Sequence, residues 1–184
     1  MIKYFNIFAN NDSVSVRITE EVRDKMKKAG ALYCEDEKEA DLIFCIGGDG
    51  ALLRLLRQYD FPEAPIVGIN TGHLGFFQEI TVDGIDELIR MLKEGNYHIQ
   101  KNSALSAEIC TDSGIRNITA INEIVIRGEG ERLMHLDMSI GGKYISRFSG
   151  DGVLICTPAG STAYNYSLGG VIVDPEVDML QVTP

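Results

Sequence analysis

The segment from Asp41 to Asp60 limits the possible folds of this chain more than any other. It begins with an uninterrupted apolar run, Leu42 to Ile46, passes through Gly47-Gly48-Asp49-Gly50, and ends with leucines at helical spacing. A strand that is apolar at every position is typical of parallel sheets that are covered on both faces. The direct passage from such a strand into an amphipathic helix therefore predicts an α/β fold.

The rest of the first half repeats this alternation of strand and helix. Further strands are expected at apolar segments, residues 2–9, 31–34 and 64–70. The first helix is expected to be capped by Ser13 or Ser15. A third helix is expected to start at a capping-box-like pair, Asp83 and Asp86, and to stop at Gly95.

After residue 95 the chain becomes β-rich, with glycine punctuation and without a convincing helix. Gly141-Gly142 stands where the two-residue turn of a hairpin is expected. We therefore predict an α/β domain with a Rossmann-like parallel sheet at residues 1–95 and an all-β, sandwich-like domain at residues 96–184. No obvious terminating element precedes Pro184, so the second domain is expected to be incomplete.

Composition excludes several classes of function. Among 184 residues, 17 basic and 27 acidic side chains leave a net charge of −10, which argues against binding nucleic acid through its phosphates. No apolar run reaches the ~18 residues of a membrane span, and the N-terminus does not resemble a signal peptide. The four cysteines show no metal-binding spacing, and Cys45 and Cys156 lie in apolar runs. A reducing, cytoplasmic setting without a membrane partner or a protein-bound metal is expected.

The glycine-rich segment Gly47–Gly50 is the first candidate site. Ligands of open α/β sheets bind at the carboxyl ends of strands, and N–H groups at a helix start attract phosphate. Asp49 there could accept a proton from a hydroxyl or help to hold a cation, or it could simply cap the helix. The segment alone leaves both interpretations open. Dinucleotide-fold GxGxxG, P-loop and GxSxG signatures are absent.

Three later segments are also rich in polar groups. Residues 70–76, which include His73, form a glycine-rich loop after the next strand. Asn122 and Glu123 are adjacent in an apolar strand, so at least one should be buried or face a cleft, unless the strand is an edge with Glu123 in solvent. Asp151 lies between glycines, as in a turn or in a binding site.

The run from residue 157 to 170 is predicted to be a long loop around a flat polar heterocycle. It combines hydroxyls, small side chains and two tyrosines. The candidates for hydrogen bonding or stacking are Thr162, Asn165, Ser167, Tyr164 and Tyr166.

Taken together, residues 47–50, 70–76, 122–123 and 150–170 resemble the NAD kinase family. The resemblance implies transfer of the terminal phosphoryl group of ATP, or of polyphosphate, to the 2′-hydroxyl of the adenosine ribose of NAD. It implies Mg²⁺ as the accompanying cation and a homodimer or homotetramer as the assembly. Asp49 would activate the hydroxyl, and the phosphates would lie over Gly47, Gly48 and Gly50.

The same resemblance assigns the substrate-binding residues. Asn122 would hold the base, Glu123 the ribose diol, and Asp151 the nicotinamide carboxamide, in some members across a subunit interface. Arg147 would be a neighbour that faces the ligand. The remaining substrate-binding positions, most of them around the adenine, are Gly50, Phe76, Thr162, Ala163, Tyr164 and Ser167.

Two features depart from the family pattern. Ala51 stands where the family commonly has Thr, which would remove a hydroxyl from the phosphate region. The family's second domain also continues beyond the equivalent of Pro184. A non-catalytic dinucleotide-binding module and a lipid kinase of the same superfamily therefore stay as alternatives, although the polar segment 160–167 disfavours a lipid acceptor.

Overall fold

The computed structural model describes residues 2–72, 75–130 and 133–184. The chain divides into two compact units, Met1–Ile99 and Gln100–Pro184. His73, part of the predicted loop at 70–76, lies outside the described residues.

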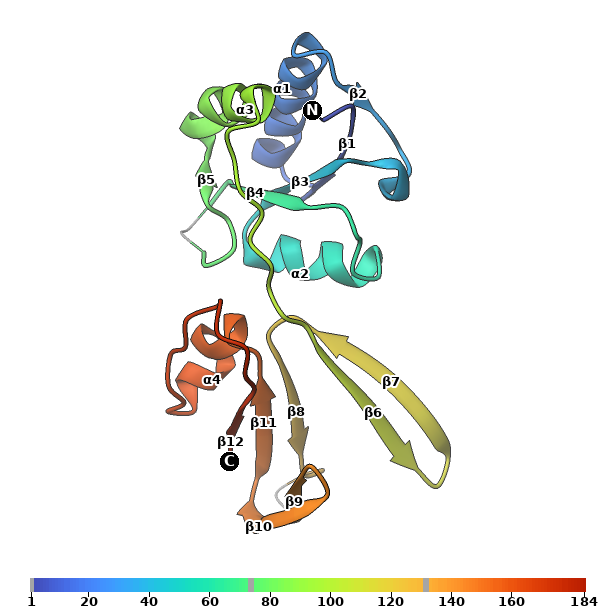
Figure 1. The fold of residues 1–184 in the computed structure, drawn as a ribbon, viewed down its shortest axis with the longest axis vertical. Coiled ribbons are helices and arrows are strands. Elements are labelled where there is room, and N and C mark those ends of the chain that lie inside the picture. The colour runs from blue at the N-terminus through green and yellow to red at the C-terminus, as the bar shows by residue number, and fades with distance from the viewer. Residues whose placement is uncertain (1, 73–74, 131–132) are drawn as a thin grey trace. The chain divides into compact units, whose positions relative to one another are not determined.

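The first unit contains the predicted parallel sheet, with strand order β2-β1-β3-β4-β5 (Figure 1). Its strands are β1 (Tyr4–Ala9), β2 (Leu32–Tyr33), β3 (Leu42–Gly47), β4 (Ile66–Asn70) and β5 (Ile80–Thr81). Its helices are α1 (Ser13–Lys28), α2 (Asp49–Gln58) and α3 (Ile85–Glu94), with short 3₁₀ helices at Glu37–Glu39 and Val82–Gly84. The expected α/β architecture is confirmed.

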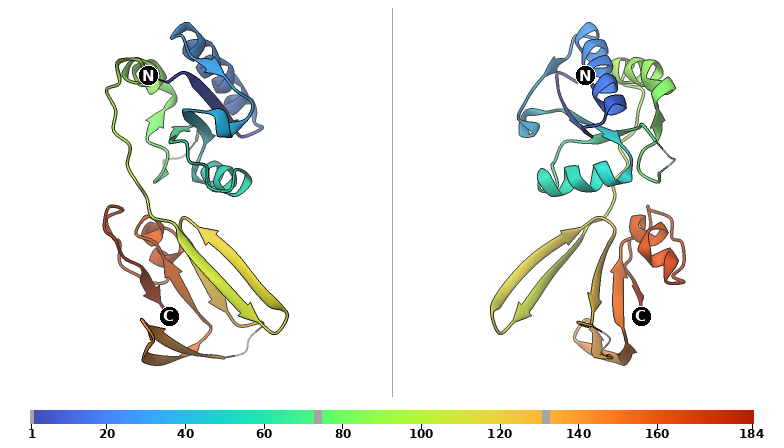
Figure 2. Two further views of the ribbon diagram at one scale, coloured as in Figure 1. Left: turned by 45° about the vertical axis from the view of Figure 1, so that its right-hand side comes forward. Right: turned by 180° about the vertical axis from the view of Figure 1, so that it is seen from behind.

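Helices cover both faces of this sheet, which explains the unbroken apolar pattern of β3. All six residues of β3 are buried. Helices α1 and α3 lie side by side on one face and α2 lies on the other (Figure 2). A core cluster lies beneath α1 and α3 and includes Phe5, Ile18, Phe44, Ile69 and Leu88. This packing fixes the carboxyl ends of β3 and β4, where the polar loops begin.

The helix ends differ in part from the prediction. Asp12, not Ser13 or Ser15, caps α1, because its carboxylate accepts the backbone N–H groups of Val14 and Ser15. In the part of the chain that the structure describes, no side chain caps α3, which begins after a 3₁₀ turn rather than at a capping box. The predicted stop at Gly95 is confirmed, with φ +71° in the left-handed region that favours glycine.

The second unit is β-rich and antiparallel, as expected. Its described strands form three small sheets, in the orders β6-β7, β10-β9 and β12-β11-β8. They are β6 (Leu105–Thr111), β7 (Gly114–Ala120), β8 (Glu123–Arg127), β9 (Met134–Ile140), β10 (Lys143–Gly150), β11 (Gly152–Cys156) and β12 (Gln181–Thr183). Gly141 and Gly142 make the predicted hairpin turn, with φ +56° and +76°.

One segment of this unit is not the predicted loop. Residues 157–170 contain a 3₁₀ helix, η3 (Ala159–Thr162), followed by a single turn of α-helix, α4 (Tyr164–Ser167). The expectation of a second half without helix is wrong here, because buried side-chain hydrogen bonds hold a segment that is too short and too polar to show helical periodicity. In the described part of the chain, no helix has the length and apolar character needed to cross a membrane.

Candidate functional site

The glycine-rich segment joins β3 to α2. Gly47 ends the strand, Gly48 is the extended residue before the helix, and Asp49 and Gly50 form its first turn. The residue before this helix is Gly48, which has no capping side chain, so among the described residues no side-chain cap occupies the first N–H groups. The interpretation of Asp49 as the helix cap is therefore not what the structure shows.

The Asp49 carboxylate instead holds the loop that follows β4. Its Oδ2 accepts the backbone N–H of Phe76 at 2.9 Å, and its Oδ1 accepts that of Phe77 at 3.1 Å. A Cβ on Gly75 would lie 2.3 Å from Asp49 Oδ1, so this approach requires glycine. Each carboxylate oxygen keeps a further lone pair for a ligand hydroxyl. Phe76, whose backbone N–H Asp49 accepts, is itself 72% exposed.

Ala51 belongs to the packing of this turn. Its side chain is 1% exposed, and a Cβ on Gly47, whose φ is +152°, would lie 2.6 Å from the Ala51 methyl. The Ala51 N–H donates to the Gly48 carbonyl at 2.8 Å. Position 51 therefore contributes buried contact between α2 and the end of β3 in this structure.

In the second unit, the backbone of Asn122 is held by the segment that follows β11. Thr157 N–H donates to the Asn122 carbonyl at 2.9 Å, and Gly160 N–H donates to Thr157 Oγ1 at 3.0 Å. A Cβ on Gly160 would lie 2.1 Å from the same carbonyl oxygen. Sequence reasoning did not single out Gly160 or Thr157, which fix the position of the Asn122-Glu123 pair.

Both side chains of that pair present buried acceptors. Asn122 Oδ1 and Glu123 Oε2 are buried and have no hydrogen-bond partner among the described residues. Burial raises the pKa of Glu123, and a backbone hydrogen bond from Tyr164 opposes that shift. Glu123 is thus half-buried rather than fully solvated, although β8 is an edge strand of its three-stranded sheet, as the alternative supposed. Buried acceptors normally find a donor, so this pair is suited to a ligand that supplies N–H or O–H groups.

This burial predicts how stability depends on pH. The raised pKa means that Glu123 favours the folded state while protonated, and that this contribution is lost as pH rises from its ordinary value of 4.5 through the folded-state pKa. We therefore expect Glu123→Gln to match the wild type in melting temperature at acidic pH and to exceed it at neutral pH. Thermal melts at a series of pH values test this; parallel curves for the two proteins would contradict it.

Helix α4 presents two of the predicted aromatic residues. Tyr164 and Tyr166 are 45% and 62% exposed, Thr162 and Ala163 are half-buried, and Ser167 is exposed. Asn165 is not available to a ligand, contrary to expectation, because it is fully buried. Its Nδ2 donates to the carbonyls of Ser161 and Val171 at 3.1 Å each, and its Oδ1 accepts from Thr183 Oγ1 at 2.7 Å.

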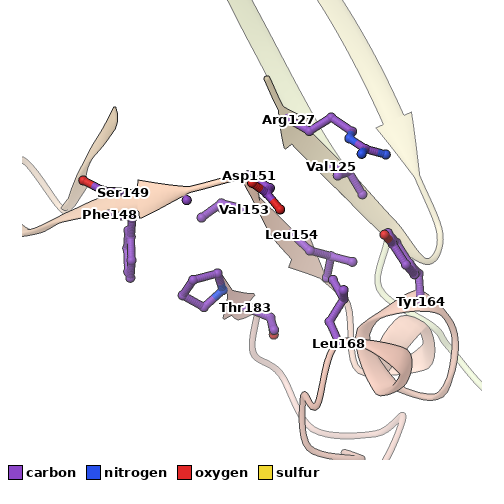
Figure 3. Close-up of a pocket in the computed structure, with 13 residues that line it drawn as sticks. Val125, Arg127, Phe148, Ser149, Asp151, Val153, Leu154, Tyr164, Leu168 and Thr183 are labelled. Atoms are coloured by element: carbon purple, nitrogen blue, oxygen red, sulfur yellow. The ribbon is translucent and has the colours of Figure 1, made fainter. Parts of the chain in front are cut away.

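Tyr164 also lines a hollow of about 420 Å³ within the second unit. Figure 3 shows Tyr164 from α4, Arg127 from β8 and Asp151 from the turn between β10 and β11 around this space. Arg127 was not predicted from the sequence. Arg147 does not line this hollow; its guanidinium makes two hydrogen bonds, of 2.8 and 2.7 Å, to Asp137 on the paired strand.

The described residues contain no group of three or more His, Cys, Asp or Glu side chains arranged to hold a metal ion. A cation that arrives with a phosphate-bearing ligand does not need such a group, because Mg²⁺ commonly binds through one or two carboxylates and substrate phosphates.

Comparison with known proteins identifies the family. Models of the ATP-NAD kinase N-terminal domain and the ATP-NAD kinase C-terminal domain match residues 6–97 and 121–184. The NAD kinase of Finegoldia magna is 41% identical over 185 residues, which cover 99% of this chain and 68% of that protein. This chain belongs to the NAD kinase family. The resemblance noted in the sequence is confirmed.

Other relatives show how much of the family's length is present. The NAD kinase of Symbiobacterium thermophilum is 40% identical over 149 residues, 79% of this chain but 52% of that protein. The chain thus spans about two thirds of the length of the first of these relatives and about half of the length of the second.

Two solved structures share its fold. Yeast NADH kinase complexed with NADH aligns with all of this chain and 65% of its own, with a TM-score of 0.87 and 22% identity. An NAD kinase from Archaeoglobus fulgidus in complex with ATP aligns with 98% of this chain and 71% of its own, with a TM-score of 0.75 and 22% identity. At this level of identity the likeness establishes the fold.

Proposed function

We propose that this protein transfers the terminal phosphoryl group of ATP to the 2′-hydroxyl of the adenosine ribose of NAD, giving NADP. The observation that carries the proposal is the pair of buried acceptors, Asn122 Oδ1 and Glu123 Oε2, without donors among the described residues. A ribose diol and the adenine amino group are donors of the kind that these atoms lack. Tyr164, beside Glu123, supplies an exposed ring for stacking.

The start of α2 is suited to the donor phosphates. Among the described residues its first N–H groups have no side-chain cap, and Gly48 and Gly50 place no side chain over them. Such N–H groups and the positive end of the helix dipole favour an anion. This supports binding of a phosphate chain in a protein whose net charge is −10.

In the proposed reaction the ribose O2′ attacks the terminal phosphorus of ATP. The bond between that phosphorus and the oxygen bridging to ADP breaks, ADP leaves, and the proton of the 2′-hydroxyl passes to the Asp49 carboxylate. Asp49 is suited to this because its oxygens, although bound to two backbone N–H groups, keep lone pairs free. Phosphoryl transfer depends chiefly on such positioning and on charge stabilisation.

The residues present fit a magnesium ion that is carried by the nucleotide. Asp49 is the carboxylate of the glycine-rich segment, and it could contribute a ligand while the phosphates contribute the others. When bound, Mg²⁺ would neutralise charge on the phosphates and on the leaving ADP. Inorganic polyphosphate has the same phosphoanhydride bond and is the alternative donor.

One observation favours a second candidate, a dinucleotide-binding module without turnover. Both Asp49 oxygens already accept backbone N–H groups, as expected of a residue that only holds a loop. NAD would then bind through Asn122 and Glu123 without phosphorylation.

A direct assay tests the proposal. Protein is incubated with ATP, Mg²⁺ and NAD, NADP is detected with an NADP-specific dehydrogenase, and NAD binding is measured by equilibrium dialysis. We expect NADP formation that requires both ATP and NAD. Binding of NAD without product would favour the module, and phosphorylation of a lipid acceptor without any effect of NAD would overturn both.

We also propose that the protein forms a homodimer or homotetramer and works in the cytoplasm. Ile140, Tyr144 and Ile145 are more than half exposed on or beside the β9–β10 hairpin, which supports a homodimer or homotetramer formed through the β-rich unit. The four cysteines are free and three of them are buried, in keeping with a reducing, cytoplasmic setting.

A further inference from the structure

Gln78 is a buried amide that has no part in the proposed reaction as described above. It follows the loop held by Asp49 and is 2% exposed. The chain immediately before it supplies the N–H groups of Phe76 and Phe77 to the Asp49 carboxylate. Gln78 therefore connects directly to the backbone that positions Asp49.

The sheet provides a slot for this side chain. Cys45 of β3 and Gly68 of β4 are register partners, and the Gln78 amide lies over both. Its Nε2 is 3.6 Å from Cys45 Sγ, and a Cβ on Gly68 would lie 2.2 Å from Gln78 Oε1. Glycine within a strand commonly marks such a close approach. Burial raises the pKa of the Cys45 thiol to about 11, so the amide meets a neutral thiol.

The amide is costly as a packing group. Its Oε1 is buried without a partner among the described residues. An apolar side chain of the same length would avoid that unsatisfied acceptor. The amide is explained by the hydrogen bond that its nitrogen makes: Nε2 donates to the Gly48 carbonyl at 3.2 Å.

The Gly48 carbonyl determines the direction of a neighbouring N–H. In a planar trans peptide the C=O of Gly48 and the N–H of Asp49 point to opposite sides. With the carbonyl directed to Gln78 Nε2 and Ala51 N–H, the Asp49 N–H is directed away from them. That N–H belongs to the uncapped first turn of α2.

We propose that Gln78 is a positioning residue, which fixes the Gly48–Asp49 peptide so that the start of α2 binds the terminal phosphates of the phosphoryl donor. This inference deepens the proposed kinase function and rests on it. Gln78 acts through Gly48 and does not itself contact the substrates.

Two substitutions separate this role from packing. Gln78→Met keeps the length of the side chain and removes the donor, whereas Gln78→Ala also opens a cavity. We expect both variants to raise the KM for ATP by about 3- to 10-fold, since a hydrogen bond contributes about 1 kcal/mol and 1.4 kcal/mol corresponds to tenfold. The KM for NAD should stay unchanged, and only Gln78→Ala should lower the melting temperature.

The outcomes decide between the two roles. If Gln78→Met has the same melting temperature and the same KM for ATP as the wild type, Gln78 only fills space and the inference is overturned. If the wild type forms no NADP, the proposed function fails. The dissociation constant for ATP, measured by equilibrium dialysis with Gln78→Met and wild type, then still tests the positioning role: a weaker constant for the variant supports it, and equal constants or no binding overturn it.

Discussion

Replacing Asp49 by Asn is expected to lower the turnover of NADP formation by about 10²- to 10⁴-fold, the usual contribution of a general base. The amide cannot take the proton of the ribose hydroxyl. It also turns one hydrogen-bond acceptor into a donor, opposite the backbone N–H groups of Phe76 and Phe77. Asp49→Asn therefore tests two roles, and the measurement has to separate them.

Separation comes from comparing turnover with binding. If Asp49 acts as the base, kcat falls while the dissociation constants for NAD and ATP, measured by dialysis, change by less than about tenfold, since one lost hydrogen bond contributes about 1 kcal/mol. If Asp49 only holds the loop, binding weakens and kcat at saturation recovers. Gly84→Ala is a suitable control, because its Cβ would meet only ordinary contacts at 3.4 and 3.7 Å and its φ is −86°.

The strands and turns that were predicted correctly are those with strong local signals. Strand β3 is apolar at every position because helices cover both faces of its sheet. The Gly141-Gly142 turn needs positive φ at two consecutive residues, which glycine adopts without strain. Helix ends were less predictable, because Asp12, Ser13 and Ser15 all have capping side chains and only the three-dimensional path shows which one points at the free N–H groups.

The candidate site was predictable where its chemistry lies in adjacent residues. Asp49 between glycines and the Asn122-Glu123 pair stand out in the sequence. In the structure Asp49 accepts two backbone N–H groups, and Asn122 and Glu123 each have a buried acceptor. Gln78 and Gly160 were missed because their roles depend on distant backbone carbonyls. Gly68, a glycine between the apolar residues of β4, is a local signal of the close approach of another side chain, here Gln78.

Asn165 shows the opposite error. Among hydroxyls and small residues it looked like a ligand-binding amide, but it bonds to Ser161, Val171 and Thr183. A polar side chain in a polar segment carries no sequence signal for burial, because the groups that satisfy it come from β12 and from the backbone on either side of α4.

Gly160→Ala is expected to have a large effect on NAD binding. The added methyl would lie 2.1 Å from the Asn122 carbonyl oxygen and 2.6 Å from its Cα, both parts of the backbone, so no side-chain rotation relieves the overlap. The segment with Thr157, Gly160 and Tyr164 must then separate from the Asn122-Glu123 pair. Overpacking of this kind costs about 1–3 kcal/mol of folding free energy.

The same displacement should weaken NAD binding by about tenfold or more, since each 1.4 kcal/mol lost from the site corresponds to tenfold. Thermal melts with and without NAD measure both effects: Gly160→Ala should melt lower, and NAD should raise its melting temperature less than that of the wild type. Gly84→Ala should keep the full NAD-dependent shift. An unchanged shift in Gly160→Ala would mean that Asn122 and Glu123 do not hold the adenosine, because the backbone that carries them cannot stay in place beside an alanine at position 160.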